Sequence, residues 1–128
     1  MGNVVLLLVE ERLIRELVGK VLTDAGCRVV ACDSFGHLVR AADESPGAVV
    51  VADFWGASDR ALDAEERAQV AYLAMTAPTI LLTGRPWAGE AMAEELGLVA
   101  VVRKPFRLND LCLCVTQTLR DWTHATTV

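Results

Sequence analysis

Five short apolar runs alternate along the chain with longer segments in which apolar residues recur every three or four positions. The runs are Val4 to Val9, Arg28 to Cys32, Ala48 to Ala52, Thr79 to Leu82 and Val99 to Val102. Short runs of this kind are typical of strands buried on both faces of a parallel sheet, and the segments between them have the period of helices. The pattern therefore predicts an α/β fold of three layers, with helices on both faces of a five-stranded parallel sheet.

Start and stop signals bound the predicted helices. Gly26 and Gly97 follow helical segments as stops, and Ser34 is a predicted N-cap. The predicted helices run from about Glu11 to Ala25, from Ser34 to the Ser45-Pro46-Gly47 turn, from Ser58 to Thr76, from Ala88 to Leu96 and from Leu108 to Trp122. The alternation continues over residues 1–128, so we expect a single domain, with residues 121–128 as a frayed tail.

Charge and composition narrow the function classes. The net charge of -5 argues against a nucleic-acid-binding domain, which would carry a basic face. No apolar run approaches the roughly 18 residues of a membrane span, and the start lacks a signal-peptide pattern, so we expect a cytoplasmic protein without membrane contact. Four cysteines without histidines at ligand spacing favour buried thiols over a zinc site or disulfides.

Polar residues follow four of the five predicted strands. They are Glu10-Glu11, Asp53, Thr83 and Lys104-Pro105. The carboxyl ends of parallel strands meet at one edge of the sheet, where ligands of such folds bind. Carboxylates are ligands for Mg²⁺, and a carboxylate can also act as the nucleophile that accepts a phosphoryl group. Lys104 and Thr83 can then bind the phosphoryl oxygens. These residues predict a magnesium-phosphate site.

These four motifs, in this order, resemble those of the CheY-like receiver domains of bacterial two-component response regulators. The resemblance covers the whole chain and implies a flavodoxin-like (βα)5 fold with strand order 2-1-3-4-5. It implies that Asp53 accepts phosphate from a histidine kinase or phosphotransfer protein, and that Thr83 and Lys104 sense it. Glu11, Asp53 and the carbonyl of Trp55 would ligate Mg²⁺, with Glu10 acting through water. A cis bond often precedes the proline that corresponds to Pro105.

Three features of the sequence depart from the pattern of the family: two single residues and one loop. Glu11 stands where the direct metal ligand is usually an aspartate, and its extra methylene puts magnesium affinity in question. Val101 stands three residues before Lys104, where an aromatic switch residue is expected, so the usual coupling of Thr83 to an aromatic side chain is missing. The loop after Asp53 lacks the common Met-Pro and Asp-Gly elements of the family.

Two functions fit these residues. The leading hypothesis is a stand-alone phospho-receiver, not an enzyme, that binds a downstream protein through the fourth helix, fifth strand and fifth helix. A homodimer through the same face is compatible with the sequence. The alternative is a pseudo-receiver that binds its partner without phosphorylation control, which Glu11 and Val101 favour. A phosphatase of the haloacid dehalogenase type would need Asp-x-Asp after the first strand, where this chain has Glu10-Glu11-Arg12.

Overall fold

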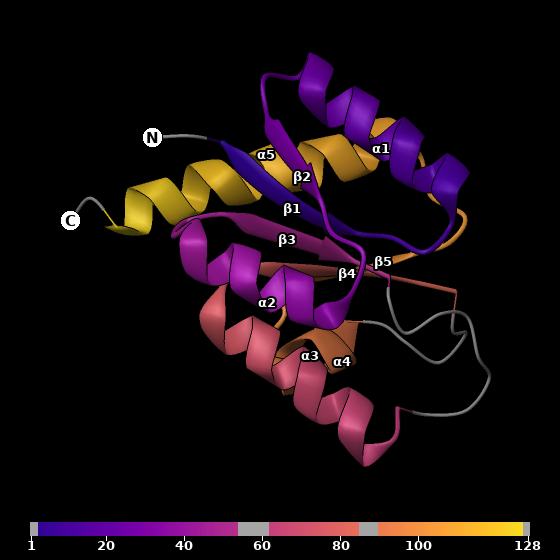
Figure 1. The fold of residues 1–128 in the computed structure, drawn as a ribbon, viewed down its shortest axis with the longest axis vertical. Helices are drawn as coiled ribbons and strands as arrows, with labels where there is room; N and C mark the ends of the chain where they lie inside the picture. Colours follow the sequence, from indigo (N-terminus) through magenta and orange to yellow (C-terminus); the bar gives the residue numbers. More distant parts are fainter. Residues whose placement is uncertain (1–2, 54–61, 85–89, 127–128) are drawn as a thin grey trace.

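The computed structural model describes residues 3–53, 62–84 and 90–126, of which 90–92 and 122–126 are described by their backbone alone. Five parallel strands form one sheet in the order β2-β1-β3-β4-β5, as the resemblance implied (Figure 1). The strands are β1 (Val4–Leu8), β2 (Arg28–Ala31), β3 (Val49–Ala52), β4 (Thr79–Thr83) and β5 (Ala100–Arg103). The helices are α1 (Arg12–Asp24), α2 (Phe35–Glu44), α3 (Ala64–Thr76), α4 (Glu90–Leu96) and α5 (Leu108–Thr126).

The sheet separates two hydrophobic cores because successive side chains of a strand point to opposite faces. On β1, Val5 and Leu7 face the core beneath α1 and α5, whereas Leu6 and Leu8 face the core beneath α2, α3 and α4. Figure 1 shows these two layers of helices on either side of the sheet. The strands β1, β3 and β4 are buried on both faces, which is why their sequences are continuous apolar runs.

Every predicted strand is present, with ends within one residue of the prediction. The predicted N-cap of α2 is also confirmed, since the Ser34 hydroxyl accepts the His37 N–H at 3.1 Å. The helix α5 continues to Thr126, so its predicted end at Trp122 was too early and the helical backbone enters the segment predicted as a frayed tail. The predicted start of the fourth helix, Ala88, lies outside the described residues.

The start of α3 corrects the sequence prediction. We expected a helix from Ser58, a residue outside the described part of the chain, but Leu62 and Asp63 precede the helix, which begins at Ala64. The Asp63 carboxylate accepts the Glu66 N–H at 2.8 Å, and the Glu66 carboxylate accepts the Asp63 N–H at 3.0 Å. This reciprocal capping box satisfies two backbone donors and sets the first turn.

The four cysteines are free thiols, but they are not all buried as predicted. Cys27 and Cys32 are buried, whereas Cys112 and Cys114 are partly exposed. Burial raises the pKa of the Cys27, Cys32 and Cys114 thiols. These three side chains therefore stay protonated at neutral pH and act as small apolar groups of the core.

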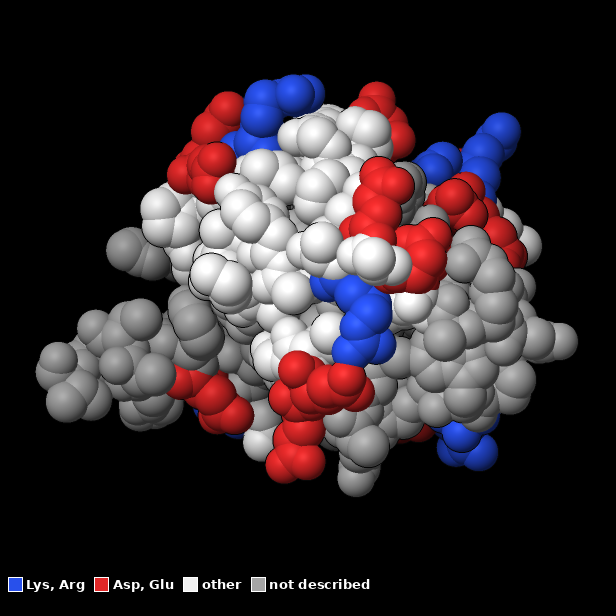
Figure 2. Space-filling model, turned by 90° about the horizontal axis from the view of Figure 1, so that it is seen from below, with Lys and Arg blue, Asp and Glu red and all other residues white. Residues whose placement is uncertain are grey.

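The surface on the side of α3 combines charged areas of both signs with uncharged areas. Figure 2, which views the molecule from below, shows a broad area without charged side chains, bordered by both acidic and basic groups. Tyr72 and Met75 on α3 belong to the exposed large hydrophobic residues, at 45% and 86% exposure. Among the described residues, no helix is both long and apolar enough to cross a membrane.

The capping box predicts a measurable stability loss. Asp63→Ala removes the acceptor for the Glu66 N–H, and we expect the free energy of unfolding to fall by about 1 kcal/mol. Asp63→Asn is the matched control, because asparagine caps helices about as well and should cost much less. Urea unfolding followed by circular dichroism measures both. Equal losses in the two variants would show that the charge of Asp63, and not its hydrogen bond, stabilises α3.

Candidate functional site

Asp53 lies directly after β3 and is the buried acid of the sheet edge. Only 2% of its side-chain surface is exposed. Its Oδ1 atom accepts the backbone N–H of Glu10 at 2.9 Å, and its Oδ2 atom accepts a hydrogen bond from the Lys104 ammonium at 2.6 Å. Its own N–H donates to the Leu8 carbonyl at 2.8 Å. Both carboxylate oxygens are thereby bonded, as a buried charge requires.

Lys104 comes to this edge from β5, on the far side of β4 from Asp53. Its N–H donates to the Thr83 carbonyl at 2.8 Å, which continues the pairing of β4 with β5 by one residue. The peptide bond between Lys104 and Pro105 is cis, as the resemblance implied. The Lys104 side chain is 19% exposed and directs its ammonium to Asp53. Sequence positions 53 and 104 therefore meet as an ion pair.

The acidic pair after β1 contributes in two different ways. The Glu11 carboxylate lies 3.9 Å from the Lys104 ammonium and is 63% exposed. Glu10 contacts Asp53 through its main-chain N–H, while the Glu10 residue itself is exposed. The sequence predicted a role for the carboxylates of both glutamates. Nothing in it indicated the hydrogen bond from the Glu10 main chain.

Thr83 is the remaining predicted site residue in the described part of the chain, and Val101 is the residue that stands where an aromatic switch residue was expected. Thr83 is the last residue of β4 and is buried. Val101 pairs with Leu81 and packs, half-buried, against the core beneath α2, α3 and α4. Trp55, whose carbonyl the resemblance implied as a metal ligand, lies outside the described residues.

The described carboxylates are compatible with a magnesium site that has only two protein ligands. Glu11 and Asp53 both approach the Lys104 ammonium, so these two carboxylates already share one cationic group. Mg²⁺ in proteins is commonly held by one or two carboxylates together with waters and phosphate oxygens. Among the described side chains no group of three or more acids, histidines or cysteines gathers at metal-binding distance. Glu11 and Asp53 are the two predicted ligands whose carboxylates lie near the Lys104 ammonium. Magnesium ligation by these two residues, with Glu10 acting through water, stays a prediction.

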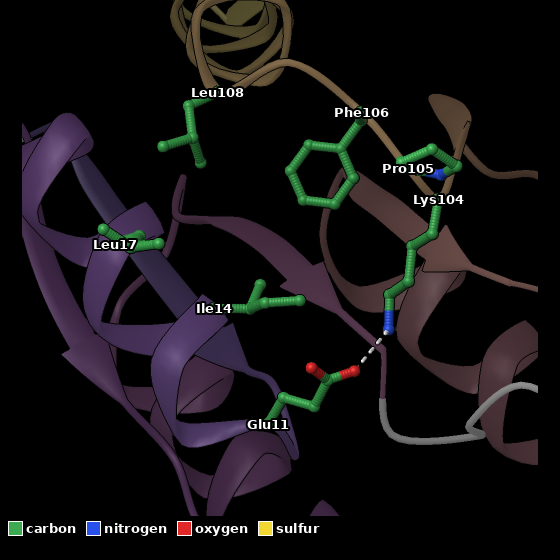
Figure 3. A pocket seen from close by; sticks show the side chains of 7 residues that line it. All are labelled: Glu11, Ile14, Leu17, Lys104, Pro105, Phe106 and Leu108. Atoms are coloured by element: carbon green, nitrogen blue, oxygen red, sulfur yellow. Dashed lines mark ion pairs between the residues drawn. The ribbon is translucent and has the colours of Figure 1, made fainter.

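A pocket of about 460 Å³ opens beside the ion pair. Figure 3 shows that Glu11, at the start of α1, and Lys104, after β5, both line this pocket and point toward each other. Its walls are apolar and come from α1 and from the segment that leads into α5: Ile14, Leu17, Pro105, Phe106 and Leu108. The charged edge of the site thus borders an apolar surface.

Comparisons with known proteins support the fold. No protein-family model and no curated protein matches the chain. Among solved structures, NtrX from Brucella abortus in complex with ADP has a TM-score of 0.77 at 20% identity over 99% of this chain. The chain spans 28% of the length of that NtrX chain. The signal receiver domain of a putative Luxo repressor protein from Vibrio parahaemolyticus has a TM-score of 0.77 at 13% identity, with 99% and 97% of the two chains covered.

A response regulator from Thermotoga maritima is similar in structure as well, with a TM-score of 0.74 at 16% identity. The alignment covers 94% of this chain and 99% of that chain. These likenesses, together with the strand order, show that the chain has the CheY-like receiver fold. The predicted flavodoxin-like architecture and the resemblance to receiver domains are confirmed at the level of the fold.

The ion pair predicts a coupled stability effect. Lys104→Met leaves the Asp53 carboxylate buried without its cationic partner, and we expect the free energy of unfolding to fall by about 3 kcal/mol. Adding Asp53→Asn to that variant removes the buried charge and should restore most of the loss. Urea unfolding of the two single variants and the double variant measures the coupling free energy between Asp53 and Lys104. Additive effects of the two substitutions would contradict the assigned pair.

Proposed function

We propose that this chain is a phosphoacceptor receiver of two-component signal transduction, with Asp53 as the phosphorylated residue. The observation that carries the proposal is the buried Asp53 carboxylate at the end of β3, bonded by the Glu10 N–H and the Lys104 ammonium. A carboxylate with fixed donors on both oxygens is presented in one orientation, which is what a nucleophile requires. The receiver fold of the chain supports the same function.

The proposed reaction transfers a phosphoryl group from a phosphohistidine of a kinase or phosphotransfer protein. A carboxylate oxygen of Asp53 attacks the phosphorus, the P–N bond breaks, and its electron pair returns to the departing imidazole nitrogen. The product is an acyl phosphate on Asp53. Lys104 moves from the carboxylate to the new phosphoryl oxygens, where its charge offsets theirs. The Thr83 hydroxyl binds another of these oxygens.

Magnesium would be held at the proposed site by Glu11 and Asp53, with the carbonyl of Trp55 as a further ligand and Glu10 acting through water. When bound, the ion would neutralise charge on the phosphoryl oxygens during transfer. The longer side chain of Glu11, compared with aspartate, is the feature of this chain that bears on its affinity for the ion.

The output of the proposed receiver is a change of protein partner and not turnover of a substrate. Phosphorylation would shift the population between two packings of the face formed by α4, β5 and α5, to which the downstream protein binds in the cytoplasm. Val101 lies on that face in place of an aromatic switch residue. The shift must therefore pass through Thr83, Lys104 and the backbone of β5.

The second candidate is a pseudo-receiver that binds its partner constitutively. Glu11 and Val101 favour it, because each departs from the receiver pattern at a position that serves phosphorylation or its readout. The preserved Asp53–Lys104 pair supports the phosphoacceptor more strongly, since partner binding alone has no need of a buried carboxylate bonded to lysine.

Phosphorylation by a small donor decides between the two candidates. We expect the protein, incubated with acetyl phosphate and Mg²⁺, to gain the mass of one phosphoryl group, and hydroxylamine to remove it as it does from acyl phosphates. Intact-mass spectrometry measures the gain, and Asp53→Asn, which should gain nothing, is the control. An unmodified wild-type protein at saturating donor and magnesium would support the pseudo-receiver instead.

A further inference from the structure

One peptide unit, between Val9 and Glu10, connects Asp53 to an arginine on the opposite side of β1. The N–H of this unit donates to Asp53 Oδ1 at 2.9 Å. Its carbonyl, which belongs to Val9, accepts a hydrogen bond from Arg15 Nη1 at 3.0 Å. The guanidinium and the carboxylate thus bind the two ends of a single amide group.

The position of this peptide explains why its carbonyl needs a hydrogen-bond donor from outside the neighbouring strands. Along β1 the carbonyls alternate between neighbours: that of Leu7 accepts from Cys32 at the end of β2, and that of Leu8 accepts from Asp53 at the end of β3. The next carbonyl, on Val9, therefore points toward the β2 side, beyond the end of β2 at Ala31. Val9 is only 2% exposed, and a buried carbonyl without a partner is costly. Arg15 supplies the donor.

The helix dipole does not favour a cation at the position of Arg15. This residue lies near the start of α1, the positive end of the helix dipole, and that first turn contains no acidic residue. Arg15 lines a hollow of about 330 Å³ together with Glu10 and Asp33, yet it forms no ion pair with any described carboxylate. The one hydrogen bond that its side chain forms in the described structure goes to the Val9 carbonyl.

A charged donor on the carbonyl strengthens the donor at the other end of the same amide. Chains of hydrogen bonds polarise one another, by roughly 10–30% per bond, and bonds to ionised groups are the strong ones. The guanidinium draws electron density toward the Val9 oxygen, so the Glu10 N–H becomes a better donor to the Asp53 carboxylate. The same two bonds also hold the plane of the peptide, which fixes the rotation of the carboxylate.

We propose that Arg15 is a positioning residue for Asp53, which acts through the Val9–Glu10 peptide on the orientation of the phosphoacceptor carboxylate. Its role in the reaction rests on the proposed function of Asp53. The relay itself exists in the unphosphorylated protein, where it can be measured without any phosphodonor.

The first test is the amide proton resonance of Glu10 in a ¹H–¹⁵N spectrum of the unphosphorylated protein. Arg15→Met keeps the length of the side chain and removes the donor, and we expect the Glu10 proton to move upfield as its bond to Asp53 weakens. Arg15→Lys should restore most of the wild-type shift. Arg12→Met is the matched control, since it removes the same charge from the same helical turn. Among the described residues, the Arg12 side chain bonds only the exposed Glu16.

The second test is the rate of phosphorylation by acetyl phosphate in the same variants. We expect Arg15→Met to lower it by roughly tenfold, the lower end of the loss when groups that orient metal ligands are removed, and Arg15→Lys to recover most of it. An unchanged Glu10 resonance in Arg15→Met would overturn the relay. A shifted resonance with an unchanged rate would overturn the positioning role. If wild-type protein takes no phosphate, the proposed function fails while the resonance still tests the relay.

Discussion

The buried carboxylate of Asp53 is the constraint on which the rest of the site depends. Burial of an unpaired charge costs several kcal/mol, so the surrounding strands must supply its partners. The fold does this from both sides of β3, with the Glu10 N–H from the end of β1 and the Lys104 ammonium from the end of β5. Neither partner is near Asp53 in sequence. The site therefore exists only when the sheet has assembled in its order, and the sheet edge is stabilised by the same contacts that orient the carboxylate.

The fold and much of the site could be predicted because they depend on local patterns. Strands buried on both faces must be apolar throughout, so β1, β3 and β4 are visible in the sequence as apolar runs. The edge strands follow from the alternation of strand and helix segments along the chain. The carboxyl ends of parallel strands share an edge, so Asp53 and Lys104 could be brought together from their positions alone. The resemblance to receiver domains then supplied the strand order, which no local pattern contains.

The remaining features depend on main-chain geometry or on competition between local signals. The bond from the Glu10 N–H to Asp53 involves no side chain of Glu10, and the Arg15–Val9 contact depends on where the pairing of β2 with β1 ends. The start of α3 was misplaced because its Ala-rich sequence lacks a clear apolar stripe, and the capping box at Asp63 sets its first turn. These contacts decide how the carboxylate is held, although the residue types alone indicate that it is there.

We propose that the Asp53 carboxylate, with its partners Glu10 and Lys104, forms a single phosphoryl-binding unit. The most direct test is a ¹H–¹⁵N spectrum recorded before and after the addition of beryllium fluoride and Mg²⁺, which together mimic the acyl phosphate. We expect saturable changes at the backbone amides of Glu10, Thr83 and Lys104, and we expect these changes to be lost in Asp53→Asn. A spectrum that does not change at these three amides, at saturating ligand, would contradict it.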